Sequence, residues 1–224
     1  KQIDLIVHWM RVGFIHGVMN TDNMTISGET IDYGPCAFMD TYDPNTVYSS
    51  IDHGRRYAYD NQPKVAQWNL ARLAESILFG IETDIQKVIP VAEGIINEFS
   101  VVYKKKWLTM MGSKLGLFFF RQDDETLILD LLDWMEKNNA DFTKTFRDLS
   151  NATYPLSKIY EDNQFSQWFD RWQNRLKNND RKLQSAISLM KSVNPNIIPR
   201  NHIVDQVLKS ADSGDFKPLS DLLL

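Results

Sequence analysis

The sequence predicts a mainly α-helical fold that carries one small β-hairpin. Apolar residues recur at the three- and four-residue spacing of amphipathic helices over most of the chain, whereas alternation of apolar and polar residues is confined to a short segment near the N-terminus. The 224 residues are 43% hydrophobic and 24% charged, which is ordinary for a globular protein, and the length is ample for a buried core.

A helix followed by the hairpin is expected at the start of the chain. Residues 3–14 place their apolar side chains at helical spacing. Residues 24–27 and 30–33 alternate around Gly28-Glu29, which is typical of two strands joined by a tight turn. The hairpin is therefore predicted at residues 24–33.

A long loop and then a series of helices are expected after the hairpin. Residues 34–62 contain Pro35, Pro44 and several Asp, and loops of this length tend to be functional. Helical spacing then returns in seven segments. These are residues 64–79, 89–111, 123–135, 141–149, 165–177, 181–193 and 201–211. We therefore predict two regions, a loop region over 1–62 that carries the catalytic and metal-binding residues, and a helical region over 63–224.

Oxygen-bearing side chains cluster around the predicted hairpin. Asn23 directly precedes the first strand, Asp32 lies near the end of the second, and Asp22 is a further carboxylate beside them. Magnesium prefers oxygen ligands and takes one or two from protein together with phosphate and water. Because neighbouring strands lie about 5 Å apart, Asn23 and Asp32 are predicted to hold one ion between them. Asn and Asp are also common in turns for local hydrogen-bonding reasons alone, so turn chemistry is the alternative interpretation.

The order of these residues is similar to the catalytic parts of protein kinases. His16 precedes Asn23 by seven residues, as in the kinase catalytic loop, and Asp32-Tyr33-Gly34 stands where kinases have Asp-Phe-Gly. Val18 occupies the position of the kinase catalytic Asp and cannot accept a proton. Asp22 is the nearest residue that could act as the base.

The chain resembles the selenoprotein O family of kinase-like protein adenylyltransferases. Four motifs carry the resemblance and extend over nearly the whole chain. They are His16-Gly17-Val18-Met19-Asn20-Thr21-Asp22-Asn23-Met24, Ile31-Asp32-Tyr33-Gly34-Pro35, Arg56-Tyr57-Ala58-Tyr59-Asp60-Asn61-Gln62-Pro63 and Asn194-Pro195-Asn196-Ile197-Ile198-Pro199-Arg200-Asn201-His202. The resemblance implies the C-terminal lobe of a protein-kinase-like fold, followed by a helical extension.

The resemblance also implies an activity, which is the transfer of AMP from ATP to Ser, Thr or Tyr hydroxyls of protein substrates. By matching position, Asp22 would be the proton acceptor, Asn23 and Asp32 would hold Mg²⁺ or Mn²⁺, and Asp32 would contact the nucleotide through the metal. Family members bind ATP inverted relative to kinases, so that the α-phosphate faces the acceptor. The location implied is cytoplasmic in a bacterium and mitochondrial in a eukaryote.

We expect this chain to be an internal piece of a longer protein, because it opens at Lys1 without Met and closes at Leu224 as a new helix begins. The family's nucleotide-binding Lys and Glu belong to an N-terminal lobe that these residues do not contain, so the chain alone is expected to be inactive. Two rival functions stay open. One is a phosphotransferase that moves the γ-phosphate, and the other is a helical interaction module without catalysis.

Composition argues against several other classes of protein. A net charge of −4 gives no reason to expect nucleic acid, and Lys104-Lys105-Lys106 is typical of a solvated helix end. No apolar run reaches the ~18 residues of a membrane span. The single Cys36 fits a reducing compartment and lacks an adjacent base, so we do not expect a nucleophile there.

Three further features have structural interpretations that we favour. His16 is expected to orient its loop through a backbone hydrogen bond, because no second His or Cys stands at metal-ligand spacing. Arg55-Arg56 could bind phosphate or an acidic substrate, but pairing with Asp60 or Asp43 is equally open. An aromatic set has helical spacing and is expected in the core. Its members are Trp134, Phe165, Trp168, Phe169 and Trp172.

Overall fold

The computed structural model describes residues 1–81, 84–179 and 181–223. Over these residues the chain is mainly helical, as the periodicity predicts, with a small antiparallel sheet near the N-terminus. The α-helices are α1 (Gln2–Val12), α2 (Gln62–Ile81), α3 (Ile85–Lys114), α4 (Gln122–Lys137), α5 (Phe142–Leu149), α6 (Asn163–Lys177), α7 (Leu183–Val193), α8 (Asn201–Asp212) and α9 (Lys217–Leu223). Three short 3₁₀ helices are η1 (Thr21–Asn23), η2 (Tyr59–Asn61) and η3 (Lys158–Tyr160).

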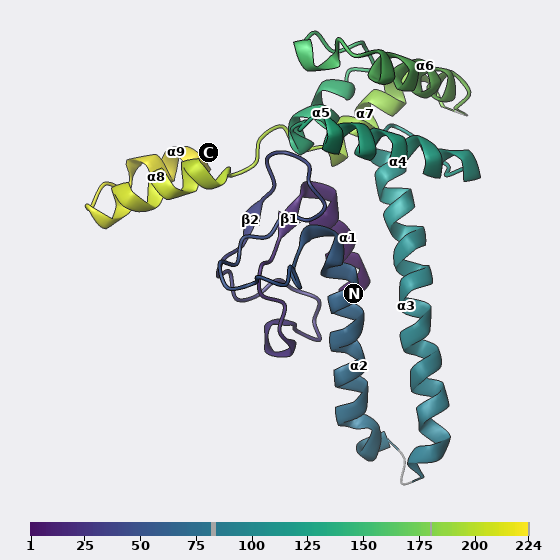
Figure 1. Cartoon of the computed structure of the whole chain (residues 1–224), viewed down its shortest axis with the longest axis vertical. Helices are drawn as coiled ribbons and strands as arrows, with labels where there is room; N and C mark the ends of the chain where they lie inside the picture. Colours follow the sequence, from purple (N-terminus) through teal and green to yellow (C-terminus); the bar gives the residue numbers. More distant parts are fainter. Residues whose placement is uncertain (82–83, 180, 224) are drawn as a thin grey trace.

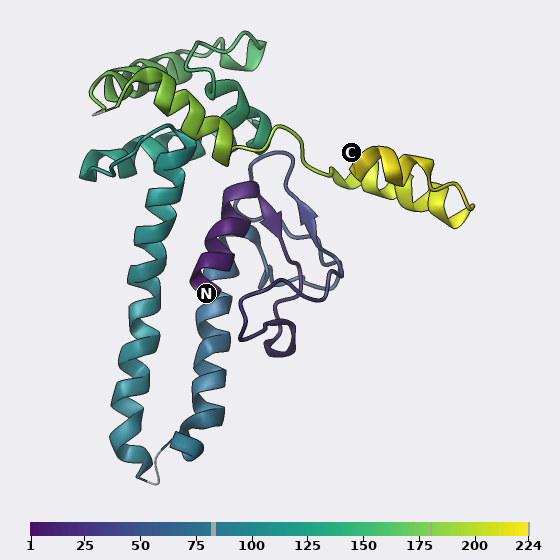
Figure 2. The same ribbon diagram turned by 180° about the vertical axis from the view of Figure 1, so that it is seen from behind.

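The helices form three groups (Figure 1). The two long helices α2 and α3 run antiparallel, and α3 ends at a cluster made of α4 to α7, whereas α2 begins beside α1. Helices α8 and α9 extend to one side as a helical arm. The sheet and the loops around it lie against α1 and α2, on the side away from α3, and the view from behind shows the same arrangement (Figure 2). The predicted loop region and helical region therefore pack directly on each other.

Helix α3 is longer than the sequence pattern predicts. It spans 30 residues, which corresponds to about 45 Å at 1.5 Å per residue, and it begins at Ile85 rather than at residue 89. Pro90 lies inside its second turn. Proline there removes only one backbone hydrogen bond near an exposed helix end, so the tertiary packing of the long helix outweighs the local break signal.

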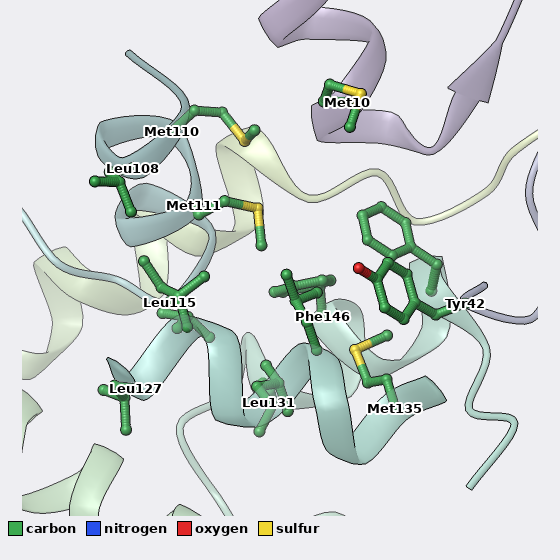
Figure 3. Packing of buried hydrophobic residues seen from close by; sticks show 14 of the residues in the cluster. Met10, Tyr42, Leu108, Met110, Met111, Leu115, Leu127, Leu131, Met135 and Phe146 are labelled. Atoms are coloured by element: carbon green, nitrogen blue, oxygen red, sulfur yellow. The ribbon is translucent and has the colours of Figure 1, made fainter. Parts of the chain in front are cut away.

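One hydrophobic core joins the first helix to the helical cluster (Figure 3). Met10 of α1, Met111 near the end of α3, Leu131 of α4 and Phe146 of α5 point toward one another, and Tyr42 of the loop region closes one side. Each of these side chains is at most 8% exposed. The core is therefore continuous across the boundary predicted at residues 62 and 63.

The predicted aromatic set lies in this core. Trp134, Trp168 and Trp172 are at most 1% exposed, and the indole rings of Trp168 and Trp172 are stacked with centroids 5.7 Å apart. Each buried indole N–H has a partner: Trp168 donates to Leu127 O at 2.8 Å and Trp172 to Leu115 O at 2.9 Å. The structural interpretation of the aromatic residues is thus confirmed.

The sheet is not where the sequence pattern predicts it. The two strands are β1 (Phe14–Ile15) and β2 (Ala37–Phe38), paired in the register Phe14 with Phe38 and Ile15 with Ala37. Of the predicted hairpin, Met24 and Thr30 form one isolated antiparallel bridge. The prediction of two strands at residues 24–33 is therefore wrong, although the chain does reverse there.

Local side-chain chemistry explains the missing ladder. Thr25 Oγ1 accepts a hydrogen bond from Glu29 N and donates one to Glu29 O, both at 3.2 Å, and so replaces strand pairing by a compact loop. Asp32 has φ 55°, a left-handed conformation that a β-strand does not accommodate. The alternation of apolar and polar residues, on which the predicted strands rest, reveals neither the Thr25 hydrogen bonds nor the left-handed backbone of Asp32.

The lysine run is solvated as predicted, but it lies within α3, which continues to Lys114, and not at a helix end. Lys104 pairs with Glu125 at 2.8 Å, and Lys106 pairs with Asp4. Lys105 is exposed. None of the helices in the described ranges combines the length with the apolar character that crossing a bilayer would require.

Candidate active site

His16 connects the two segments that the sequence analysis singled out. The imidazole is 1% exposed, and its Nε2 lies 2.7 Å from Ile31 O, directly before Asp32. Val18 N donates to Nδ1 at 3.4 Å, which assigns the ring proton to Nε2 and makes that nitrogen the donor to Ile31 O. The expectation that His16 orients its loop through backbone contacts is thus confirmed.

Asp22 and Asn23 lie on the short helix η1, which follows the His16 loop. Asn23 Nδ2 donates to Val18 O at 2.9 Å, so its Oδ1 is the atom left to accept a further ligand. Asp22 is exposed, and within the described ranges its carboxylate has neither a hydrogen bond nor an ion pair. The turn therefore presents one amide oxygen and one accessible carboxylate from adjacent positions.

Asp32 lies on the segment that runs back past the His16 loop. Its side chain is exposed, and no partner for its carboxylate occurs among the residues that the structure describes. Its carbonyl oxygen accepts from Gly34 N at 2.8 Å, which closes a tight turn. The left-handed backbone at Asp32 and this turn fix the direction of the segment between Ile31 and Pro35.

Gly17 allows the two segments to approach closely. It has φ 84°, and a β-carbon built on it would lie 2.8 Å from Pro35 O. Real Cβ atoms essentially never come so near to a backbone oxygen, so a side chain at this position would force the segments apart. The approach of His16-Gly17 to residues 31–35 therefore depends on glycine.

The bridge between Met24 and Thr30 brings the segments together a second time. If its antiparallel register is continued, the residue across from Asp32 is Asp22, and Asn23 is the next residue along the same segment. No further ladder pairs form beyond the bridge. The His16 contact and the bridge thus hold the chain before and after Asp22 and Asn23, and hold the other segment at the two residues before Asp32.

The chemistry of these side chains fits a hard divalent cation. Asn23 Oδ1 and the carboxylate of Asp32 are oxygen donors of the kind that Mg²⁺ prefers, and neither is used by a protein partner in the described part of the chain. No group of three His, Cys, Asp or Glu in the described ranges is arranged to hold a metal by itself. Two protein oxygens suit an ion that takes its remaining ligands from phosphate and water.

Three residues that sequence reasoning missed hold the site loops in place. Gln62, at the start of α2, is fully buried, accepts from His16 N at 3.0 Å and donates to Phe14 O at 3.0 Å. Asn69, two turns further along α2, donates to Met19 O at 2.9 Å. Tyr57 donates from its hydroxyl to Asn20 Oδ1 at 2.5 Å. For Gln62 and Asn69 the sequence signal is a polar residue on a mostly apolar face of α2, whereas Tyr57 lies in a turn and has no such signal.

Removal of the Tyr57 hydroxyl is expected to loosen the turn that carries Asp22 and Asn23 with little effect on folding. Tyr57→Phe loses one hydrogen bond to the exposed side chain of Asn20, so the free energy of unfolding should fall by only about 0.5–1.5 kcal/mol. Because Asn20 stands two residues before Asp22, any turnover that depends on Asp22 should fall more than this small stability change explains. Chemical denaturation and turnover measured in parallel check the expectation, and a variant with unchanged turnover contradicts it.

An apolar groove of about 860 Å³ begins next to the turn. Thr21 and Met24 line one end of it, and the facing surfaces of α2 and α3 supply most of the remaining wall. Gln2 Oε1 and Asn69 Oδ1 are buried at this groove and have no hydrogen-bond partner within the described residues. The groove would therefore best accept an apolar group that also carries hydrogen-bond donors.

Other residues named from the sequence have different surroundings. Arg55 and Arg56 form no ion pair with Asp60 or Asp43 in the described ranges, so the pairing that the sequence left open does not occur there. Instead, the Arg56 guanidinium lies 4.7 Å from the ring centroid of Trp68. Asp52 accepts from the backbone of Arg56 at 2.9 Å and thereby shapes the loop.

Cys36 does not have the surroundings of a nucleophile. Partial burial raises the pKa of its thiol, so the reactive thiolate is less populated than in a free cysteine. The side chain is half-buried and packs against the hydrophobic core. Burial thus supports the expectation that Cys36 is not a nucleophile.

Comparisons with known proteins all identify the same protein family. Residues 1–224 match the family model described as "Protein adenylyltransferase SelO". The chain is 53% identical over 223 residues to the protein nucleotidyltransferase YdiU of Nitrosococcus oceani, and 52% identical over 224 residues to that of Alcanivorax borkumensis. These alignments cover 99% and 100% of this chain but 45% and 46% of the relatives. The chain thus spans about half the length of the curated relatives that it matches.

Proposed function

This chain belongs to the protein adenylyltransferase SelO family, and from that premise we propose that the full-length protein transfers AMP from ATP to hydroxyl side chains of other proteins. The observation that carries the proposal is the exposed carboxylate of Asp22, which has no partner among the described residues, directly precedes the amide of Asn23 and adjoins the Asp32 segment. A base and two metal-binding oxygens within one small loop system suit phosphoryl chemistry.

The proposed reaction is an in-line displacement at the α-phosphorus of ATP. Asp22 accepts the proton of a Ser, Thr or Tyr hydroxyl, and the hydroxyl oxygen forms a bond to the α-phosphorus. The bond between that phosphorus and the oxygen that bridges to the β-phosphate breaks, and pyrophosphate leaves with the electron pair. A divalent ion bound by Asn23 and Asp32 would neutralise the charge on the phosphate oxygens. His16 and Gly17 keep the two segments at a fixed separation during the reaction.

Asp32 is proposed as a metal ligand, so its replacement should alter the dependence on magnesium. For Asp32→Asn in the full-length protein, we expect the Mg²⁺ concentration at half-maximal activity to rise at least about tenfold, equivalent to 1.4 kcal/mol. Glu29→Gln is the matched control, because Glu29 is an exposed acid of the same loop whose carboxylate contacts Ser27. Measuring activity against Mg²⁺ concentration for both variants tests whether Asp32 binds the metal. Equal curves for Asp32→Asn and the wild type would remove Asp32 from the metal site.

We further propose that the chain is the C-terminal lobe of a kinase-like fold with a helical extension. Two observations support this proposal. The fold is mainly helical, and the loop from His16 to Asn23 is followed by Asp32-Tyr33-Gly34, as in the kinase order of catalytic parts. Within this lobe, residues 1–62 would carry the reacting groups and residues 63–224 would support them through Gln62 and Asn69. The remainder of the full-length protein would supply the other half of the nucleotide site.

The function is tested by following the two ends of the ATP triphosphate separately. The full-length protein is incubated with a protein substrate and with ATP labelled either at the α-phosphate or at the γ-phosphate. Transfer of the α-label alone is the expected result. Transfer of the γ-label would instead establish a phosphotransferase. If neither label is transferred and calorimetry detects no magnesium-dependent ATP binding, the chain is an interaction module.

A further inference from the structure

Two arginines lie against the ring of one exposed tryptophan, beside the turn that carries Asp22. Trp68 of α2 is 44% exposed, and the guanidinium carbons of Arg56 and Arg72 lie 4.7 Å and 5.1 Å from its ring centroid. We refer to Arg56, Trp68 and Arg72 as the guanidinium shelf. Cation–π attraction holds each guanidinium near the ring and so limits its motion. The shelf is therefore a partly ordered cationic surface rather than a pair of freely moving side chains.

The positive charge of the shelf is only partly neutralised by the protein. Arg72 pairs with Glu75 at 2.6 Å, whereas Arg56 has no carboxylate partner in the described part of the chain. Asp52, four residues before Arg56, uses its two carboxylate oxygens on the backbone N–H groups of Arg56 and Tyr57. Asp60, four residues after Arg56, forms no ion pair with it in the described ranges. The hydrogen-bond donors of the Arg56 side chain thus stay available to a group from outside the chain.

Several contacts connect the shelf to the turn that carries Asp22. Tyr57, whose ring lies 5.8 Å from the Arg56 guanidinium, donates its hydroxyl hydrogen bond to Asn20. Asn69, the neighbour of Trp68 on α2, holds Met19 O. Arg72 and Thr21 line the same groove. The shelf therefore flanks the catalytic turn on its α2 side.

We propose that the guanidinium shelf binds an acidic side chain of the protein substrate close to the hydroxyl that receives AMP. This proposal rests on the function proposed above and names a substrate feature for the same site. Asp22 and Asp32 are exposed carboxylates that would repel an acidic segment, and a cationic surface next to them offsets this repulsion. Arginine is the side chain whose planar donor set matches a carboxylate, and restraint by the indole ring lowers the entropy lost on binding.

The test compares two peptide substrates and two charge-matched variants in the full-length protein. Both peptides carry one acceptor hydroxyl; one has Asp residues on either side of it, and the other has Asn at the same positions. The variants are Arg56→Gln and Arg55→Gln. Arg55 is an adjacent exposed arginine with no aromatic ring beneath it in the described structure, so its replacement removes the same charge without touching the shelf. Transfer of α-labelled AMP gives KM and kcat for each peptide.

Arg56→Gln is expected to raise KM for the acidic peptide by about 10- to 100-fold, the range that corresponds to loss of a charged hydrogen bond. The kcat value, the KM for ATP and the kinetics of the Asn peptide should stay near wild-type values. Arg55→Gln should leave KM for the acidic peptide within about twofold, because an exposed charge without a fixed partner contributes little. Thermal unfolding of both variants controls for stability.

Two outcomes would overturn the proposal while leaving AMP transfer intact. If Arg55→Gln raises KM for the acidic peptide as much as Arg56→Gln does, the rise comes from the loss of one positive charge and not from loss of the guanidinium shelf. If Arg56→Gln raises KM for ATP instead, the shelf serves nucleotide phosphate. If the wild-type protein transfers no label to any peptide, the proposed function fails. Fluorescence anisotropy of the two peptides then tests the shelf directly, and equal affinity for both peptides overturns it.

Discussion

Asp22→Ala in the full-length protein is expected to slow AMP transfer by about 10²- to 10⁴-fold, the usual contribution of a general base. The carboxylate lies on an exposed turn and has no partner in the described ranges, so its removal should not disturb the fold. ATP affinity should stay near the wild-type value, since Asn23 and Asp32 keep their oxygens. Single-turnover kinetics with α-labelled ATP measure the rate, and calorimetry measures ATP binding.

Asp205→Ala is a suitable control for this experiment. Asp205 is an exposed aspartate of α8, on the helical arm away from the turn, so its loss changes the net charge equally without touching the site. We expect wild-type turnover from it. Undiminished labelling by Asp22→Ala would refute the assignment of the base, and an equal loss in both variants would point to charge rather than proton transfer.

Gln62→Leu is expected to lower the free energy of unfolding by about 2–6 kcal/mol, because it leaves two buried backbone groups without partners at about 1–3 kcal/mol each. These groups are the N–H of His16 and the C=O of Phe14, both of which the Gln62 amide binds at 3.0 Å. Leucine has a similar volume, so the effect reports the lost hydrogen bonds and not a cavity. Urea denaturation of the chain measures it.

Gln67→Leu provides the comparison. Gln67 lies on the same helix and donates one hydrogen bond, to Ile96 O at 2.9 Å, but its side chain is only half-buried and water can replace the lost partner. A loss of about 0.5–1.5 kcal/mol is therefore expected. If the free energy of unfolding falls equally in the two variants, Gln62 has no special part in holding the segment from Phe14 to His16.

The helices could be predicted from the sequence because their signals are local. The apolar spacing of α4 and α6 survives in the structure with bounds that shift by only one or two residues, since each helix buries one continuous stripe. The prediction of a hairpin at residues 24–33 failed for an equally local reason, which the spacing of apolar residues does not reveal. The hydroxyl of Thr25 competes with the backbone for Glu29, and Asp32 takes up a left-handed conformation.

For the candidate site, too, the local features could be predicted from the sequence and the long-range contacts could not. Asp22, Asn23 and Asp32 could be named because they lie within eleven residues of one another and form a motif. The contacts that hold their loops join residues 46, 50 and 37 positions apart, through Gln62, Asn69 and Tyr57. The contacts of Gln62 and Asn69 form only when α2 has packed against the loop, and a single sequence does not show which polar side chain meets which distant partner. Whether Asp22, Asn23 and Asp32 act together stays a prediction.

Gly17 leads to a practical criterion for choosing working members of the family. With Pro35 O only 2.8 Å from the place of a first side-chain carbon, even alanine would meet a backbone oxygen that cannot rotate away. A homologue or designed variant with any other residue there would have to reroute its polypeptide before it could react. Libraries built to change acceptor preference should therefore leave codon 17 untouched and vary the surrounding loops instead.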